Sequence, residues 1–510
     1  MKNKDIIFNL IGNIIVYLLA LIVSFVLSPY IVKEMGVATF GFIALANNFV
    51  GYFTLITVSI TSMAGRFVSL EVFQKNNEKA NVFFNSVFFA SVALTTFLAI
   101  CVGVIIFNLE KIIKIPANEI IDVKWLFVGV FLAFLLGLLF SVFSIGLFVE
   151  NKIYKRSQHM VEANLVRATA LFLMFFLLTP HLYYWGIMGT AYAMYILIWN
   201  IHYTRKYIPE LKLNPKFFDI KAVITVISAG VWNVISQLGG VLNDGLDLII
   251  TNQIIGSAQM GILSIAKVIP NTFTQLLAQL GEPFMPKMTH AYAKNDKNEL
   301  LGIINYSSKI LGLLMSIPVA LFIVLGGVFF RLWYPHQDAN LLHVLGILSI
   351  ADMIINTSSV LLFGIFTVTN KLKLNSLMTI ACGAVNTMLV LIFLHTTSLG
   401  LYAVAGVSVT LSILRNLCFT FPYAARCAGL KWNVFYKAAL KNMLSVGVIG
   451  IISYIALRVI NPYSWLTLIL TGGICIIFGL SINLFVVLNR SDRNILLRTV
   501  KKKLKIKSRA

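Results

Sequence analysis

Residues 311–330 read LGLLMSIPVALFIVLGGVFF, twenty consecutive positions without a charged side chain. About twenty apolar residues are what a helix needs to cross the hydrocarbon core of a bilayer, which is about 30 Å thick. The rest of the chain has the same character: 59% of its 510 residues are hydrophobic, 12% are charged, and the mean hydropathy is +0.88. Soluble domains carry about 25% charged residues. The composition therefore predicts an integral membrane protein and excludes a cytosolic enzyme, a secreted disulfide scaffold and a nucleic-acid-binding domain.

Apolar segments of this kind recur along the whole chain. They are much longer than the strands of a membrane barrel, and an open sheet cannot span lipid because its edge groups would stay unpaired. The sequence therefore predicts an all-α membrane protein with about fourteen transmembrane helices. These are expected near residues 6–32, 38–64, 80–108, 122–149, 157–180, 183–204, 222–254, 257–281, 300–330, 340–368, 373–395, 399–424, 435–459 and 464–489.

The distribution of Lys and Arg gives the orientation. Cytoplasmic loops of membrane proteins are enriched in these residues. With the N-terminus in the cytoplasm and fourteen spans, about 31 of the 41 Lys and Arg lie inside and only six lie outside. One missed helix would invert every later loop and destroy this asymmetry. We therefore expect a multi-pass protein of the bacterial cytoplasmic membrane with both termini in the cytoplasm, and we interpret the net charge of +22 as membrane orientation rather than as affinity for nucleic acid.

The chain also contains a weak internal repeat with an offset of 220 residues. Residues 40–46 align with 260–266, Asn13 aligns with Asn233, and with a slip of one residue 73–76 aligns with 292–295. Both copies begin on the same side of the membrane and pass through six helices. The repeat predicts two six-helix lobes in parallel orientation, the usual plan of transporters whose binding site lies between the lobes. The expected divisions are an N-lobe at 1–220, a C-lobe at 221–430, helices 13 and 14 at 431–490, and a basic cytoplasmic tail at 491–510.

Several of these residues also resemble a known family. They are the helix start at Asn9–Asn13, the turn Gly36-Val-Ala-Thr-Phe-Gly41, its counterpart Gly256-Ser-Ala-Gln-Met-Gly261, the basic loop after helix 2, and Pro283-Phe-Met-Pro286. The pattern is similar to the polysaccharide-transporter branch of the multidrug/oligosaccharidyl-lipid/polysaccharide exporter superfamily. That branch contains the Wzx-type flippases for O-antigen, capsule and teichoic acid. The resemblance covers nearly the whole chain.

Polar side chains within the predicted helices are candidate functional groups, because burying them in lipid is expensive. Helix 7 carries a stripe with a period of three to four residues. Its members are Asn233, Ser236, Gln237, Gly240, Asp244, Asp247 and Thr251. We expect Asp244 and Asp247, with Asn233 and Gln237 on the same stripe and Asp352 in helix 10, to take part in coupling to Na⁺ or H⁺. An alternative is that the two aspartates are wetted at the outer mouth of the protein.

Cations at membrane depth either pair with a buried acid or face an anionic ligand. Arg167 lies in helix 5, Lys267 in helix 8 and Arg415 in helix 12, and Arg66 lies at the cytoplasmic end of helix 2. We expect these four to line a cationic cavity that binds the phosphates of a cargo. Pairing of the first three with Asp244, Asp247 and Asp352 is the alternative, and for Arg66 a position at the membrane interface is equally compatible with the sequence.

The motifs of an enzyme are not found in this sequence. The chain has no G-x-x-x-x-G-K-[ST] motif for ATP hydrolysis, no metal-binding spacing of His or Cys, and no large loop with an acidic pair. We therefore expect neither catalytic activity nor a metal or cofactor, apart from Na⁺ or H⁺ as a coupling ion.

The resemblance and the intramembrane cations together predict a flippase. Its cargo would be a polyprenyl-pyrophosphate-linked oligosaccharide, which would cross by alternating access, and its partners would be membrane lipids and the glycosyltransferases and polymerase of the same pathway. A flippase for the lipid precursor of peptidoglycan is the nearest alternative, followed by a multidrug cation exporter of the same superfamily. A membrane-embedded polymerase or ligase is disfavoured because the longest outer loop, near 109–121, has only about a dozen residues.

The topology can be tested by labelling. In a variant without the five native cysteines, a cysteine that replaces Asn118 should react in intact cells with a membrane-impermeant thiol reagent. A cysteine that replaces Asn295 should react only after the cells are opened. Labelling of position 295 in intact cells would contradict the fourteen-helix topology.

Overall fold

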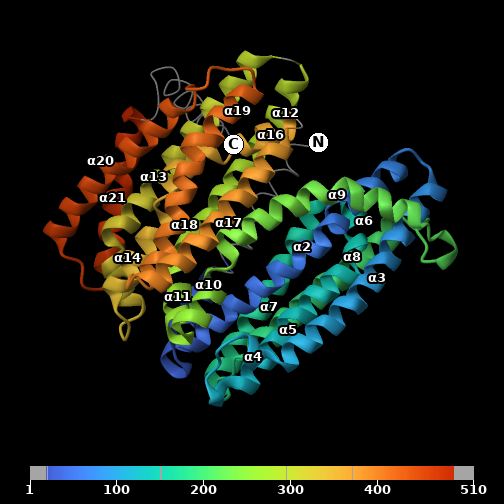
Figure 1. Cartoon of the computed structure of the whole chain (residues 1–510), viewed down its shortest axis with the longest axis horizontal. Coiled ribbons are helices and arrows are strands. Elements are labelled where there is room, and N and C mark those ends of the chain that lie inside the picture. The colour runs from blue at the N-terminus through green and yellow to red at the C-terminus, as the bar shows by residue number, and fades with distance from the viewer. Residues whose placement is uncertain (1–18, 20, 150–151, 295, 370, 487–510) are drawn as a thin grey trace, which may run out of the picture. The chain divides into compact units, whose positions relative to one another are not determined.

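The structure, a computed structural model, describes residues 19, 21–149, 152–294, 296–369 and 371–486, and every regular element among them is a helix (Figure 1). The predicted all-helical class is therefore confirmed. Ten helical segments of this described part are long and apolar enough to cross a membrane. The predicted segments at 183–204, 222–254 and 257–281 are also helical without meeting that criterion, and the segment at 6–32 lies mostly outside the described residues, so the number fourteen stays a prediction.

The helices of the first half of the chain, after a helical stretch at 21–35, have the following bounds: α2 Val37–Phe73, α3 Asn77–Phe107, α4 Leu109–Ile112, η1 Ala117–Glu119, α5 Ile120–Leu139, η2 Ser141–Ser144, α6 Ile145–Val149, α7 Ile153–Leu177, α8 Tyr183–Tyr207, η3 Pro215–Phe217, α9 Ile220–Gly240, η4 Val241–Gly245, α10 Asp247–Ile250 and η5 Thr251–Ile255. The second half continues with α11 Ser257–Gly281, η6 Glu282–Phe284, α12 Met285–Ala293, α13 Lys297–Trp333, α14 Ala339–Ile350, α15 Met353–Ser359, α16 Leu362–Val368, α17 Leu372–Thr396, α18 Leu401–Arg415, η7 Asn416–Thr420, α19 Phe421–Cys427, α20 Tyr436–Ile460 and α21 Trp465–Val486.

Polar side chains mark where several of these helices begin. Asn76 accepts a hydrogen bond from the backbone N–H of Lys79 at the start of α3, and Asp219 caps α9 in the same way. Asp296 and Asp338 each accept two backbone N–H groups at the starts of α13 and α14. Such caps satisfy amide groups that have no partner within the helix. The predicted boundaries near 80, 222, 300 and 340 lie within a few residues of these caps.

The described residues form two compact units. The N-unit contains the residues up to Ser264 together with Thr379–Thr387 of α17, and the C-unit contains the remainder. The predicted lobe division at 220 and 430 stays a prediction. Each unit is considered by itself below.

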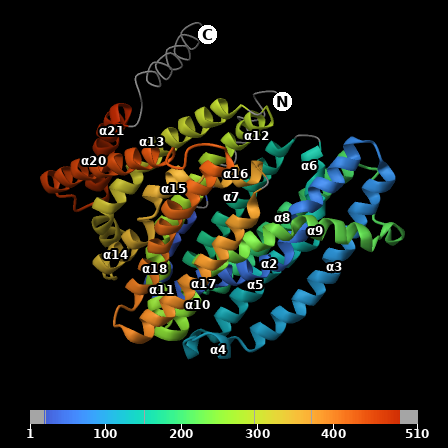
Figure 2. The same ribbon diagram turned by 45° about the horizontal axis from the view of Figure 1, so that its top comes forward.

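In the N-unit, glycines let helices approach closely. A Cβ atom on Gly186 of α8 would lie 2.9 Å from the backbone oxygen of Leu126 in α5, and Gly129 of α5 faces Gly186 directly. α5 and α8 consequently run side by side (Figures 1 and 2). Small residues at such contacts are typical of membrane helices, which associate through close packing rather than through a hydrophobic driving force.

In the N-unit, hydrogen bonds join helix ends to loops that are predicted, from the distribution of Lys and Arg, to lie on the same side of the membrane. Asn81 and Asn85 near the start of α3 donate to the backbone oxygens of Glu210 and Lys212, both at 2.9 Å, in a loop predicted to be cytoplasmic. Asn252 exchanges hydrogen bonds with the backbone of Lys114 in the loop after α4, predicted to lie outside. Each contact thus joins two connections that are predicted to lie on the same side of the membrane.

The two copies of the predicted repeat meet within the N-unit. Gly36 and Gly256 each precede a helix with a positive φ, of 97° and 147°, which an L side chain rarely adopts. Five residues later, a Cβ atom on Gly41 would lie 2.9 Å from the Cα of Gly261, and a Cβ atom on Gly261 would overlap the carbonyl oxygen of Val37. Equivalent glycines of the two copies therefore form one close helix contact.

In the C-unit, α13, α20 and α21 pack side by side (Figures 1 and 2). Asn483 of α21 donates to the hydroxyl of Ser316 at 2.7 Å and to the backbone oxygen of Leu313 at 3.2 Å, both on α13. Ser445 of α20 donates to the side-chain oxygen of Asn483. Helices α20 and α21, which the sequence suggested as an addition to the repeat, are thus attached through buried polar contacts.

The glycine contact predicts a selective loss of stability. Gly261→Ala should destabilise the protein because its methyl group needs the space of the Val37 carbonyl, and overpacking of this kind costs about 1–3 kcal/mol. Gly51→Ala is the matched control, because no atom lies within 4 Å of a Cβ at that position of α2. The measurement is the unfolding temperature of both purified variants in detergent. Equal unfolding temperatures would contradict the close contact.

Candidate functional site

The helical segments of the chain are interrupted at three places that concern charged residues. The π-helices η4 and η5 flank the four-residue helix α10, α14 and α15 are separated at Ala351–Asp352, and the π-helix η7 directly follows Arg415. Each interruption contains or adjoins a charged residue that the sequence identified. Because π-bulges and broken membrane helices occur frequently at functional sites, these places are the candidate site.

The interruption in the N-unit frees backbone oxygens, which side chains of other helices bind. Gly245 accepts hydrogen bonds from the hydroxyl of Tyr52 at 2.6 Å and from the amide of Asn48 at 3.2 Å, both on α2. Asn386 and Thr387 of α17 donate to the backbone oxygens of Asn243 and Leu242, at 2.8 and 3.1 Å. In lipid, an unsatisfied carbonyl costs several kcal/mol, so these four side chains hold the irregular backbone in place.

Asp247 begins α10 directly after this irregular turn, and its side chain is buried, with a relative exposure of 2%. It is close enough to Tyr52 for the two groups to interact electrostatically. The side chains of Asn233 and Asp244 lie outside the described part of the structure, and Gln237 on α9 is exposed. Of the predicted aspartate pair, Asp247 is thus placed inside the N-unit beside the residues that bind the Gly245 carbonyl.

The interruption in the C-unit is organised around Asp352. Its carboxylate accepts hydrogen bonds from the amide of Asn356 and from the hydroxyl of Ser412, both at 2.7 Å. Asn416, in the π-helix η7, donates to the side-chain oxygen of Asn356 at 2.7 Å. The break before α15 and the π-helix after α18 are thereby linked by one hydrogen-bonded network. Its carboxylate, amide and hydroxyl oxygens are of the type that binds Na⁺.

Arg415 adjoins this network in the chain, because Asn416 follows it directly. Its guanidinium carbon lies 5.3 Å from the centre of the Phe363 ring of α16. Arg167, in the N-unit, similarly lies 5.1 Å from the ring centre of Trp185 on α8. Stacking on an aromatic face stabilises a guanidinium that is partly removed from water. Both arginines are partly buried.

The other two predicted cations differ from each other in their exposure. Lys267 is partly buried on α11 in the C-unit, three residues before Pro270 within the same helix. Arg66 is exposed on α2, as expected of a residue at the interface. The structure does not test the predicted roles of these residues in binding or coupling. Among the described residues, no group of three or more His, Cys, Asp or Glu side chains is arranged to hold a metal ion.

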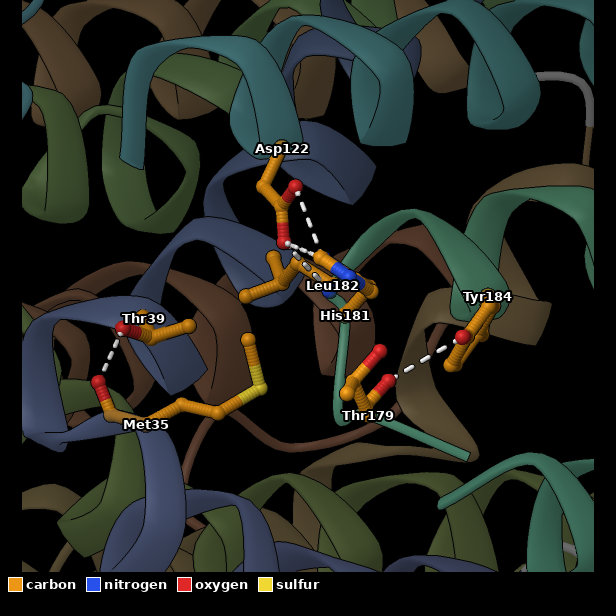
Figure 3. Close-up of polar contacts among 7 residues, drawn as sticks. All are labelled: Met35, Thr39, Asp122, Thr179, His181, Leu182 and Tyr184. Carbon is orange, nitrogen blue, oxygen red and sulfur yellow. Dashed lines mark hydrogen bonds and ion pairs between the residues drawn. The ribbon is translucent and has the colours of Figure 1, made fainter. Parts of the chain in front are cut away.

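Two polar contacts were missed by the sequence reading. Asn442 of α20 is buried and donates to the hydroxyls of Thr357 and Ser358 on α15, at 3.2 and 2.8 Å. In the N-unit, Asp122 at the start of α5 binds the ring of His181 at 3.0 Å and the backbone N–H of Leu182 at 3.1 Å (Figure 3). An Asn within an apolar run was the available signal for the first contact. No local signal pairs residues 59 positions apart.

Each unit also has an apolar groove. In the N-unit, a groove of about 650 Å³ lies between α5 and α8 and is lined by Trp125, Leu132 and Ile187. In the C-unit, a groove of about 490 Å³ is lined by Ile323 of α13 and by Gly447 and Gly450 of α20. Both glycines of the second groove have open space where a Cβ atom would be.

No family model matches the chain. The uncharacterized membrane protein EpsK of Bacillus subtilis (strain 168) is 27% identical over 496 residues, which cover 97% of this chain and 98% of that protein.

Solved structures share the arrangement of helices. A structure of the lipid II flippase MurJ in an inward closed conformation aligns with a TM-score of 0.63 and 16% identity, over 94% of this chain and 99% of that chain. An inward-facing multidrug resistance MATE family transporter of the MOP superfamily aligns with a TM-score of 0.64 and 13% identity, over 85% and 94% of the two chains. At these identities the likeness concerns architecture alone: this multi-pass membrane protein has the fold of the MOP superfamily transporters.

Proposed function

We propose that this protein is a flippase that moves a polyprenyl-pyrophosphate-linked oligosaccharide across a bacterial cytoplasmic membrane. The observation that carries the proposal is the set of partly buried cations on three helices, Arg167 on α7, Lys267 on α11 and Arg415 on α18. Burying a cation in lipid is unfavourable unless it faces water or an anion. A pyrophosphate is an anion that such cations can bind, and arginine matches phosphate oxygens with paired N–H donors.

The extent of the structural likeness also favours a flippase over a drug exporter. The MurJ structure covers 94% of this chain, whereas the MATE structure covers 85%. More of this chain therefore has a structural counterpart in the flippase than in the exporter. A flippase for a lipid-linked peptidoglycan precursor shares this argument, so the choice between the two cargos rests on the sequence resemblance to the polysaccharide branch.

The apolar grooves suit a cargo with a long hydrocarbon tail. In the C-unit groove, Gly447 and Gly450 remove two side chains from the surface of α20 and leave a channel beside Ile323 and Tyr454. A polyprenyl chain gains from each methylene that it buries against such a surface, through close packing. On this proposal the tail stays in the bilayer while polar groups of the protein bind the sugars and phosphates.

Two acidic sites are proposed to couple transport to an ion. Asp247 is buried and lies two residues after Gly245 in the N-unit, and Asp352 accepts hydrogen bonds from Asn356 and Ser412 in the C-unit. Either oxygen-rich group can take up Na⁺ or H⁺. Glycosyltransferases that build the cargo and a polymerase that uses it complete the proposed pathway.

Transport can be measured with a fluorescent polyprenyl-pyrophosphate disaccharide in vesicles that contain the purified protein. A membrane-impermeant reductant quenches the fluorophore in the outer leaflet, and a flippase makes the inner pool accessible too. Arg415→Gln should weaken cargo binding by roughly tenfold to a hundredfold, because hydrogen bonds to charged groups contribute about 1.5–3 kcal/mol. Lys79→Gln is the matched control, an exposed residue in a predicted cytoplasmic loop.

Three outcomes would contradict the proposed site or the proposed cargo. Transport by Arg415→Gln at the rate of the Lys79→Gln control would remove the cation from the binding site. Transport of a fluorescent organic cation instead of the pyrophosphate lipid would favour a drug exporter, and transport only of a lipid-linked muropeptide would favour the peptidoglycan precursor.

A second prediction concerns Asp247. Moving negative charge outward is favoured by an inside-negative potential, by about 2.3 kcal/mol per charge per 100 mV. The carboxylate is therefore not required as a source of driving force, and we expect it to govern the return of the empty protein. Asp247→Asn should slow turnover and abolish dependence on Na⁺ or pH while leaving transport that follows the potential. The same ion dependence in Asp247→Asn and the unmodified protein would exclude this role.

A further inference from the structure

A small basic pocket in the C-unit shares no lining residue with the interruptions at Ala351–Asp352 and η7. Its volume is about 250 Å³. Lys297 at the start of α13, Lys371 between α16 and α17, and Arg426 at the end of α19 line it, together with Tyr292 and Gly429. Three separate segments of the chain, within 292–300, at 371 and within 426–429, therefore contribute to one concave surface.

The pocket carries a net positive charge. Asp296 is the acidic residue of its lining, and its carboxylate already accepts the backbone N–H groups of Asn298 and Glu299, at 3.0 and 2.9 Å. In the part of the chain that the structure describes, no carboxylate lies within ion-pair distance of Lys297, Lys371 or Arg426. Among the described residues, these three cations thus surround a hollow without an acidic partner within ion-pair distance.

Hydrogen bonds to the backbone hold two of the chain segments that carry these cations. The end of α19 closes with hydrogen bonds from Gly429 N–H to Arg426 and from Leu430 N–H to Ala425, at 3.2 and 2.8 Å. Gly429 has a φ of 67°, which allows this left-handed closure, and its missing side chain leaves room for the ammonium group of Lys297. The hydroxyl of Tyr423 on α19 donates to the backbone oxygen of Lys371 at 3.1 Å, which fixes the segment at Lys371.

The position of the pocket relates it to the membrane surface. Lys297 begins one candidate membrane span, Lys297–Trp333, and Cys427 ends another, Leu401–Cys427. The pocket therefore lies where two spans reach their polar boundary. On the orientation predicted from the distribution of Lys and Arg, this boundary is the cytoplasmic one.

We propose that this pocket binds a phosphate group at the cytoplasmic surface of the membrane. Two ammonium groups and a guanidinium suit a multiply charged oxyanion, and the guanidinium can bind two phosphate oxygens at once. The volume is below the roughly 300–1,000 Å³ of pockets for drug-sized ligands, so it suits a single phosphate-bearing group. That group belongs either to an anionic lipid or to a soluble phosphate compound. The proposal is independent of the transported cargo.

Binding should stabilise the protein, because the ligand joins the start of α13, the α16–α17 connection and the end of α19. The full-length protein is placed in nanodiscs of phosphatidylcholine alone. In one arm, phosphatidylglycerol replaces part of the lipid; in the other, inorganic pyrophosphate is added to the buffer, with chloride at the same ionic strength as its control. The unfolding temperature is measured across a concentration series, which gives an apparent affinity.

A rise with phosphatidylglycerol alone identifies a lipid headgroup as the ligand, and a rise with pyrophosphate alone identifies a soluble phosphate. The variant Lys297→Gln/Lys371→Gln/Arg426→Gln should lose this rise. The control variant Lys79→Gln/Arg205→Gln/Lys216→Gln, which removes the same charge from exposed positions of the N-unit, should keep it.

The single variant Arg426→Gln protects the test against misfolding of the triple variant. It should lower the apparent affinity by roughly fivefold, since a basic residue near an anionic surface contributes about 1 kcal/mol. The proposal would be overturned if the unfolding temperature rose with neither phosphate source. It would also be overturned if the unfolding temperature rose equally in the pocket variant and in the control variant.

Discussion

The structure depends on one constraint, that backbone N–H and C=O groups within lipid need partners inside the protein. A regular helix meets the constraint by itself, which is why every membrane segment of this chain is helical where it is described. Where a helix is interrupted, side chains must supply the partners. Tyr52, Asn48, Asn386 and Thr387 do so for the turn that ends at Gly245. An irregular turn can therefore persist at membrane depth only where a polar cluster surrounds it.

The same constraint explains why charge and irregular backbone coincide. Asp352 lies at a break between two helices, and Arg415 directly precedes a π-helix. Asp247 is separated from the π-helix η4 by a single residue, Leu246. Asp247 follows a turn whose backbone is bound by polar side chains, and Asp352 accepts hydrogen bonds from polar side chains, so the additional cost of placing these carboxylates inside the protein is reduced. A protein of this fold can thus concentrate polar groups at a few turns and keep much of the remaining helix surface apolar.

Close packing imposes a second requirement, because helices in lipid gain little from hydrophobic association. The chain meets it with glycines, and the contact of Gly41 with Gly261 shows how a repeat in the sequence becomes a contact in space. Elsewhere polar side chains join the helices, as Asn483 and Asn442 do in the C-unit. Helix contacts in both units therefore rest on small residues and on hydrogen bonds.

The sequence by itself determined the helical class, the approximate bounds of the segments, the asymmetry of Lys and Arg, and the polar residues that interrupt apolar runs. These properties are local, since hydropathy and the internal pairing of a helix depend on neighbouring residues. The tertiary structure alone decided which distant groups meet: Tyr52 with the carbonyl of Gly245, Asp122 with His181, and Asp352 with Ser412. Such pairings depend on how helices pack and where their backbone leaves the regular α-form. The paired residues are 59 to 193 positions apart, so no local pattern in the sequence specifies how the helices pack or where their backbone becomes irregular.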